Sequence, residues 1–369
     1  MKMNRTFRLA TVAFLVTFAL VPLTSHAAPI TSGDLVIYRV GDGTAALGTA
    51  ATAVFLDEYS PLGTLVQSIP LPTSGVTALT ATGNSTTEGV ISVSQNGTPQ
   101  ATLVFTGYRA DVGTATPSSA TPATVNRVIG TIGLGGLANT TVALTDPTGA
   151  IRSAASTDGS SLFYIGTAAA VRYVGTPGPA ATSVSIDARN SRQVLMSGNK
   201  LFASNGSTSI TGKVQDYGNL PTTTTAANPD VVLATADAVN GFALFDLDAG
   251  VAGDDTLYAL STVEGLLRKY SLVGGVWTAN GSIATGAQDL TGYAAGSSVN
   301  LFLTSGTTLS SEIDNSGYNT SITGTITTLA TASANEGFRG IAVLIPEPSS
   351  FCLAIVGTAS LLAIRRRRS

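Results

Sequence analysis

Short runs of alternating or β-branched apolar residues recur along the chain, separated by clusters of Gly, Asn, Asp and Pro. Runs of this kind predict β-strands, and the clusters predict the turns between them. After residue 28, no window of ten or more residues has the apolar period of an amphipathic helix. The pattern therefore predicts an all-β body, whose clearest strands are 34–40, 90–94, 101–105, 161–165, 193–196 and 256–260.

The predicted strands fall into groups of four, which is typical of the blades of a β-propeller. Two groups are clear, at 241–283 and 288–329. Looser groups lie at 151–185, at 186–214 and at 88–145, and the last of these holds an insertion rich in Pro, Ser and Thr.

The two ends of the body complement each other. Strands at 34–40, 52–58 and 63–70 lack an innermost partner, while 337–344 is a single strand without a group. Their pairing closes a ring of six blades and protects the sheet edges. Seven blades is the alternative, because 215–240 has room for further strands. A β-sandwich or β-helix adhesin has a similar composition, but four-strand groups with a terminal closure favour the propeller.

The N-terminus has the three parts of a secretory signal peptide. Lys2, Arg5 and Arg8 precede an apolar stretch at 9–23, and the small residues Ser25 and Ala27 occupy positions −3 and −1 of a cleavage site after Ala27. A retained membrane anchor is the alternative, but the apolar stretch is shorter than the ~20 residues that a span needs. The body then covers residues 28–345.

The C-terminal segment 346–369 has a tripartite pattern. Its Pro-Glu-Pro element is followed by an apolar run at 351–364, which predicts a short transmembrane helix, and by basic residues that stay on the cytoplasmic side. The residues concerned are Pro346, Glu347, Pro348, Arg365, Arg366, Arg367 and Arg368.

This pattern resembles the PEP-CTERM sorting signal of bacterial envelope proteins, which is also known as the ice-binding protein C-terminal domain. The resemblance implies that an exosortase recognises the Pro-Glu-Pro element and processes the tail. A permanent tail anchor in a thinned bilayer is the alternative.

Charge and residue types exclude several functions. The body carries 12 basic and 21 acidic residues, a net charge of −9, which disfavours binding to nucleic acid or anionic lipid. The one histidine, His26, belongs to the signal peptide, so the body has no Ser-His-Asp triad and no His-based metal site. The one cysteine, Cys352, lies in the tail, so the body forms no internal disulfide.

One acidic segment is a candidate calcium site. The loop 246–255 contains Asp246, Asp248, Asp254 and Asp255, and carboxylate oxygens are ligands that calcium prefers. It lacks the spacing of an EF-hand, and Asp and Gly are also common in interstrand turns. No other cofactor is predicted.

Carboxylates elsewhere invite a catalytic interpretation. Asp57, Glu58 and Glu88 can be compared with the acid pair of a glycosidase or lyase. Adjacent residues of a strand point to opposite faces, so Asp57 and Glu58 are not that pair. The favoured interpretation is that one of them bonds to Arg109 or Arg339 near the axis of the ring.

The body also resembles large secreted propeller-like proteins that carry the same tail, through the stretches 38–43, 54–63, 105–109 and 337–342. That group has no assigned activity. We therefore predict an exported envelope protein that is not an enzyme and has a binding or structural role at the cell surface or in its exopolysaccharide.

The expected partners are signal peptidase and exosortase during processing, the membrane through the tail, and glycans or other envelope proteins at the propeller. Nucleic acid is not among them. The rival hypothesis is a carboxylate-dependent polysaccharide hydrolase or lyase. Ice binding is a third, but the body lacks the Thr-x-Thr ladder of a solenoid ice-binding face.

Overall fold

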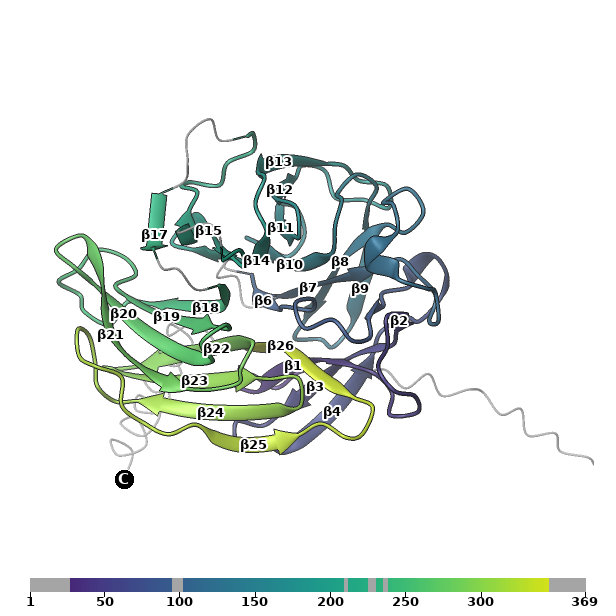
Figure 1. The fold of residues 1–369 in the computed structure, drawn as a ribbon. Coiled ribbons are helices and arrows are strands. Elements are labelled where there is room, and N and C mark those ends of the chain that lie inside the picture. The colour runs from purple at the N-terminus through teal and green to yellow at the C-terminus, as the bar shows by residue number, and fades with distance from the viewer. Residues whose placement is uncertain (1–26, 95–101, 209–211, 225–229, 235–237, 345–369) are drawn as a thin grey trace, which may run out of the picture.

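The computed structural model describes residues 27–94, 102–208, 212–224, 230–234 and 238–344. They form six four-stranded antiparallel sheets arranged around one axis, a six-bladed β-propeller (Figure 1). The all-β prediction and the favoured count of six blades are confirmed. The helical segments of the described residues are two short 3₁₀ turns, η1 (Gly75–Thr77) and η2 (Pro117–Ser119). Within these same ranges, no helix has the length and apolar character needed to cross a membrane.

The four strands of each blade are ordered from the central axis outward. Blade 1 contains β26 (Gly337–Val343), β1 (Leu35–Val40), β3 (Val54–Tyr59) and β4 (Leu65–Pro70). Blade 2 contains β6 (Ser92–Val93), β7 (Thr102–Tyr108), β8 (Arg127–Gly133) and β9 (Ala138–Leu144). Blade 3 contains β10 (Ile151–Ser156), β11 (Phe163–Thr167), β12 (Val171–Val174) and β13 (Ser183–Asp187).

The second half of the ring follows the same plan. Blade 4 contains β14 (Ser191–Ser197), β15 (Lys200–Asn205), β16 (Gly212–Asp216) and β17 (Asp230–Ala234). Blade 5 contains β18 (Val239–Phe245), β19 (Thr256–Ser261), β20 (Leu266–Val273) and β21 (Val276–Ala284). Blade 6 contains β22 (Asp289–Ala295), β23 (Ser298–Thr304), β24 (Thr308–Asp314) and β25 (Thr327–Thr331). A further two-stranded sheet joins β2 (Ala51–Thr52) to β5 (Ala81–Thr82).

The segment 215–240, which left room for a seventh blade, instead completes blade 4. Its strand β17 pairs with β16, and β18 then begins blade 5. The looser group predicted at 186–214 was therefore cut short by one strand.

The ring closes through the two ends of the body. Strand β26 pairs with β1 in antiparallel register, with Leu35 opposite Val343 and Ile37 opposite Ile341. In Figure 1 the yellow strand β26 accordingly lies beside the purple strands β1 and β3. The predicted terminal closure is confirmed.

Burial explains why inner strands appear as almost continuous apolar runs. On β1, Val36 and Tyr38 pack into one apolar cluster, while Leu35 and Ile37 pack into another on the opposite face. A strand between two neighbouring blades has both faces covered, so polar alternation disappears. The outermost strand β21 is largely exposed and is correspondingly more polar.

The innermost strands share an irregularity that positions the functional site. In β10, β14 and β18 the register shifts between Ile151 and Ser153, between Ser191 and Val194, and between Val239 and Phe242. In β26 the shift falls at residues 339–340. Such β-bulges turn a side chain away from the alternation of the strand.

Candidate functional site

Each blade contributes one polar residue to the same end of the central axis. In blades 1, 3, 4 and 5 this residue lies in the bulge of the innermost strand, and in blades 2 and 6 it lies shortly before that strand. We call these six residues the axial ring: Glu88, Arg152, Arg192, Asn240, Gln288 and Arg339.

A cavity of about 220 Å³, the axial cavity, lies at this end of the axis. A narrower space of about 20 Å³, the throat, shares five of its lining residues and reaches Glu88, Asp289 and Arg339. Hydroxyl, amide and guanidinium groups dominate the lining of the larger space, which consists of Thr86, Thr87, Arg192, Asn240, Thr262, Gly265, Thr285, Gly286, Ala287 and Gln288.

Hydrogen bonds between blades hold the axial ring in place. The side chains of Ser153 and Gln193 accept the backbone N–H groups of Val194 (3.0 Å) and Phe242 (2.6 Å) in the next blade. Because each acceptor directly follows a ring residue in sequence, these bonds fix the bulges from which the ring side chains project.

Arg339 and Glu88 form the most buried pair of the ring. The Nη2 of Arg339 donates to the carbonyl oxygens of Thr82 (2.6 Å) and Gly83 (2.8 Å), while Nη1 lies 3.9 Å from Oε2 of Glu88. The carboxylate of Glu88 also accepts bonds from the backbone N–H of Thr82 (3.1 Å) and from the hydroxyl of Tyr108 (3.0 Å). Burial raises the pKa of Glu88, although Arg339 acts in the opposite direction.

Arg152 and Arg192 bring two positive charges together. The Nη1 of Arg152 donates to Oδ1 of Asn190 and to the carbonyl oxygen of Ser191 (2.9 Å). Burial, and then the charge of Arg192, lower the pKa of Arg152 to about 10. Burial also lowers the pKa of Arg192. The site therefore holds cations that repel each other.

Asp289 borders the throat but has a structural role. Its carboxyl group accepts the backbone N–H groups of Leu290 (3.0 Å) and Ile341 (3.2 Å), which links blade 6 to blade 1. Burial raises the pKa of Asp289 to about 8, so this group is largely neutral at pH 7 and adds little negative charge.

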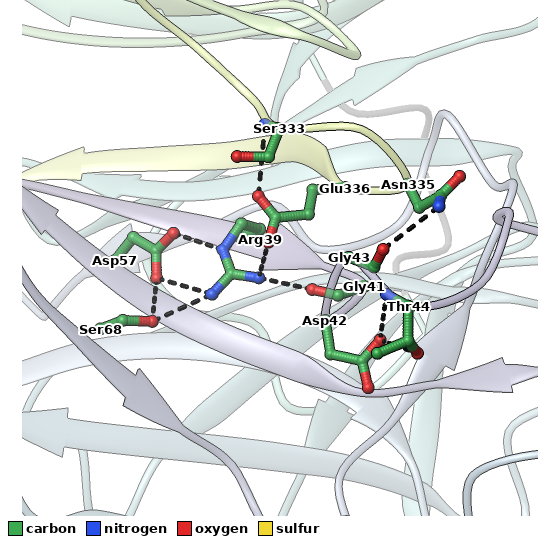
Figure 2. Close-up of polar contacts among 10 residues, drawn as sticks. All are labelled: Arg39, Gly41, Asp42, Gly43, Thr44, Asp57, Ser68, Ser333, Asn335 and Glu336. Carbon is green, nitrogen blue, oxygen red and sulfur yellow. Dashed lines mark hydrogen bonds and ion pairs between the residues drawn. The ribbon is translucent and has the colours of Figure 1, made fainter.

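The carboxylates Asp57 and Glu58 lie away from this site. Figure 2 shows Asp57 bonded to Arg39, with its Oδ2 2.5 Å from Nε, and to Ser68. Glu58 accepts the backbone N–H of Thr31 (2.6 Å) and the side-chain amide of Gln67 (2.6 Å). Both carboxylates are structural, as predicted.

The predicted partners of that pair were wrong, because Arg39 takes the place expected for Arg109 or Arg339. Arg109 donates to the carbonyl oxygens of Ala78 (2.7 Å) and Thr140 (2.5 Å), and Arg339 faces Glu88 in the throat. Arg39 is the neighbour of Asp57 because β1 and β3 are paired strands. The predicted order of the strands was sufficient to place these two residues close together.

The acidic loop uses two of its four candidate calcium ligands, Asp255 and Asp248, to hold its own backbone. Asp255 is fully buried, and its oxygens accept the N–H groups of Leu247 (3.1 Å) and Asp248 (2.6 Å) and the hydroxyl of Thr256 (2.7 Å). Asp248 accepts the N–H of Gly250 (2.9 Å), as in an Asx turn. Throughout the described ranges, no three His, Cys, Asp or Glu side chains are grouped so as to hold a metal ion. Calcium binding by Asp246, Asp248, Asp254 and Asp255 stays a prediction.

The targeting segments fall almost entirely outside the described residues. This applies to the signal peptide before Ala27, to Pro346, Glu347 and Pro348, and to the cluster Arg365–Arg368. Their assignments stay predictions.

A cavity of a different character lies along the later part of the inner strands. It has a volume of about 160 Å³, and its lining combines apolar residues such as Leu195, Phe242 and Leu290 with polar ones such as Gln193. The lining is therefore more apolar here than at the ring.

Sequence reasoning missed most of the axial ring. Its arginines occur in three comparable fragments, 151-IRS-153, 191-SRQ-193 and 338-FRG-340, each at the start of an inner strand. An arginine that recurs at the same place in successive strand groups is a signal that could have identified the site.

Comparisons with known proteins found distant likenesses among solved structures. No protein-family model matches the chain, and no curated protein does. Solved structures similar to it include a protein from Bacteroides fragilis provisionally named a 6-phosphogluconolactonase, at 10% identity over 81% of this chain and 82% of that chain, with a TM-score of 0.46.

A second similar structure is the periplasmic gluconolactonase PpgL of Pseudomonas aeruginosa, at 11% identity over 81% of this chain and 83% of that chain, with a TM-score of 0.44. A third is the computationally designed protein Ika8, at 10% identity over 74% of this chain and 72% of that chain, with a TM-score of 0.35. Two of the three are thus named as lactonases, but likeness at this level transfers no activity to this chain.

Proposed function

We propose that this chain is an exported envelope protein, sorted through its tail, whose propeller binds a component of the cell surface or its exopolysaccharide without cleaving it. The observation that carries the binding role is the axial cavity with its throat, a polar hollow to which the axial-ring residues Glu88, Arg192, Asn240, Gln288 and Arg339 contribute from five of the six blades. Ligand sites are typically concave, with a few convergent polar groups that fix orientation.

The state of the carboxylates supports binding rather than catalysis. A hydrolase or lyase needs an acid and a base with oxygens free to meet the substrate. At the throat, both oxygens of Glu88 accept protein hydrogen bonds, and both oxygens of Asp289 accept backbone N–H groups. Among the residues described along the axial cavity, none is a Lys, Tyr, Cys or His that could act instead.

Two experiments test the proposal. Intact mass of the protein from envelope and medium, compared with a strain lacking exosortase, should show loss of residues 1–27, and loss of the tail only when exosortase is present. Retention on immobilised exopolysaccharide from the same cells, with the polymer length unchanged after incubation, should show binding without cleavage. A protein that keeps its tail in both strains, or that is not retained, would refute the corresponding half of the proposal.

A second candidate function is a carboxylate-dependent polysaccharide hydrolase or lyase. It is favoured by one observation, namely that Glu88 and Asp289 border the same throat beside Arg339, and both have a raised pKa. Incubation with acidic and neutral polysaccharides, followed by assay of new reducing ends or unsaturated products, tests it. Product formation by the wild-type chain and its loss in Glu88→Gln would favour this candidate over simple binding.

A further inference from the structure

The axial ring holds three guanidinium N–H groups that have no hydrogen-bond acceptor. They are Nε of Arg152, Nε of Arg192 and Nη1 of Arg339. Arg152 and Arg339 are only 8% and 7% exposed, so water has little access to them. A buried donor without a partner costs about 1–3 kcal/mol. An acceptor placed in the throat, which Arg192 and Arg339 line, would remove that cost for these two residues.

The balance of charge around the ring favours an anionic acceptor. Three of the 12 basic residues of the body gather here, although the body as a whole carries a net charge of −9. The nearby carboxyl groups compensate only in part, because Glu88 is shared between Arg339, Thr82 and Tyr108, and Asp289 is held by backbone N–H groups. The charges of Arg152 and Arg192 repel each other, and Glu88 offsets this repulsion only in part.

The position of Arg192 leaves its guanidinium available. Within the described residues, Arg192 has no hydrogen bond or ion pair, and it lines both the axial cavity and the throat. Its Nε lies against the backbone of Gly206, where a methyl group would come within 1.9 Å of that atom. The glycine thus provides the space in which this guanidinium lies.

We propose that the axial ring binds the carboxylate of an acidic sugar, with Arg192 and Arg339 donating to the carboxylate and the amides of Asn240 and Gln288 bonding to sugar hydroxyls. Guanidinium groups form strong, directional bonds to carboxylates. The cavity volume of about 220 Å³ lies below the range of about 300–1,000 Å³ typical of sites for drug-sized ligands, which suits a single sugar unit. This inference rests on the proposed binding function and specifies its ligand.

A second cavity indicates that the sugar belongs to a chain. It has a volume of about 210 Å³, is lined by hydroxyl groups that include Ser305, Thr308 and Thr328, and shares residues 285–287 with the axial cavity. The middle residue of that shared ridge is Gly286, which has no side chain to obstruct passage. A neighbouring unit of a polymer can therefore lie across the ridge while the acidic unit occupies the ring.

Calorimetric titration of the full chain with galacturonate hexamer, galacturonic acid and the methyl-esterified hexamer tests the inference. The hexamer should bind at least tenfold more tightly than the monomer, and esterification should weaken binding at least tenfold. Arg192→Gln should lose at least tenfold in affinity at an unchanged melting temperature. Gly206→Ala keeps the charge but displaces the guanidinium, so it should also weaken binding. Arg172→Gln, an equal charge loss on β12 away from the axis, is the matched control.

Several results would overturn the inference. Equal binding of the esterified and acidic hexamers would remove the role of the carboxylate, and equal affinity for inorganic phosphate or sulfate would assign the ring to other anions. Retention on native exopolysaccharide that survives Arg192→Gln would overturn the inference while the proposed function stands. Absence of retention by the wild-type chain would refute the proposed function itself. Tight monomer binding equal to that of the hexamer would contradict the polymer source.

Discussion

Arg39 and Glu336 lie 297 positions apart in the chain, yet Nη1 of Arg39 donates a hydrogen bond to Oε1 of Glu336 (3.0 Å). Figure 2 shows that the same guanidinium binds Asp57 on β3, Ser68 on β4 and the carbonyl oxygen of Gly41. One side chain therefore ties the three N-terminal strands of blade 1 to the loop that introduces β26. We call this set of contacts the seam. Closure of the propeller depends on the seam because blade 1 is the only described blade built from both ends of the body.

Replacement of Arg39 by Ala should destabilise the whole propeller. The Arg39 and Asp57 side chains are only 10% and 3% exposed, and removal of one partner leaves a buried charge without compensation. Losses of about 3–5 kcal/mol in the free energy of unfolding are typical for such a change. Urea unfolding followed by circular dichroism measures it.

The control for this experiment is Lys200→Ala, which breaks the pair with Asp216. Lys200 has a side-chain exposure of 48%, and exposed pairs contribute about 0–1 kcal/mol. Equal losses in the two variants would mean that the seam has no special role in closing the ring.

A second buried pair should behave differently when both members are replaced. Nζ of Lys269 lies 2.7 Å from Oδ2 of Asp314, both side chains are fully buried, and Tyr258 donates to the same oxygen (2.6 Å). Lys269→Met alone should cost about 3–5 kcal/mol. The double variant with Asp314→Asn should recover most of that loss, because the buried charge of Asp314 is then also removed. A double variant as unstable as the single one would show that the hydrogen bonds, rather than the charge, carry the stability.

The strands of the blades were predictable because strands that are buried on both faces appear in the sequence as short, nearly continuous apolar runs. The run 35–40 on β1 is apolar on both sides, and the pairing of β26 with β1 follows from counting unpartnered strands at the two ends. Only blade 4 was misjudged, where the last strand, β17, follows a long polar segment. In this chain, strand content is therefore a local property of the sequence, and closure follows from comparing the strand count at the two ends.

The axial ring was not predictable in the same way. Arg152, Arg192 and Arg339 lie in bulges, where side chains no longer alternate between the two faces of the strand. In the sequence they therefore look like ordinary polar residues at the ends of strands. Their proximity depends on the geometry of the whole ring rather than on their sequence neighbours. The partner of Asp57 was misjudged for a different reason: the pairing of β1 with β3 places Arg39 beside Asp57, and this neighbour was not considered.

Removal of calcium should leave the stability of the acidic loop unchanged. Both oxygens of Asp255 already accept hydrogen bonds from N–H and hydroxyl groups of the loop. These bonds hold the loop without a bound calcium ion. Melting temperatures in the presence of calcium and of a chelator should agree. Asp255→Asn should cost about 1–3 kcal/mol in both conditions, because one of the two acceptor oxygens becomes an NH₂ donor and a buried N–H group loses its acceptor. A calcium-dependent rise in melting temperature would contradict this expectation and support the sequence prediction.

The stability of the propeller should fall as pH rises from about 4.5 to 7, in part because of Glu312. This carboxyl group is 1% exposed, and neither oxygen has a hydrogen-bond partner. Burial, and then the charge of Asp314, raise the pKa of Glu312 from 4.5 to about 7. In this window the unfolded chain has lost a proton that the folded chain still holds, so the free energy of unfolding decreases with a slope of up to about 1.4 kcal/mol per pH unit.

Glu312→Gln removes that titration and therefore separates it from other causes. The variant and the wild-type chain should have similar stability at pH 4, while at pH 8 the variant should be more stable by about 3 kcal/mol. Some decline should persist in the variant, because burial also raises the pKa of Asp289 to about 8. Glu264→Gln, on the half-exposed side chain of Glu264, is the control and should shift stability by no more than about 0.5 kcal/mol at either pH. Urea unfolding at both pH values measures the difference. A pH profile identical in Glu312→Gln and the wild-type chain would show that this buried carboxyl group does not titrate in the window, and that another group causes the decline.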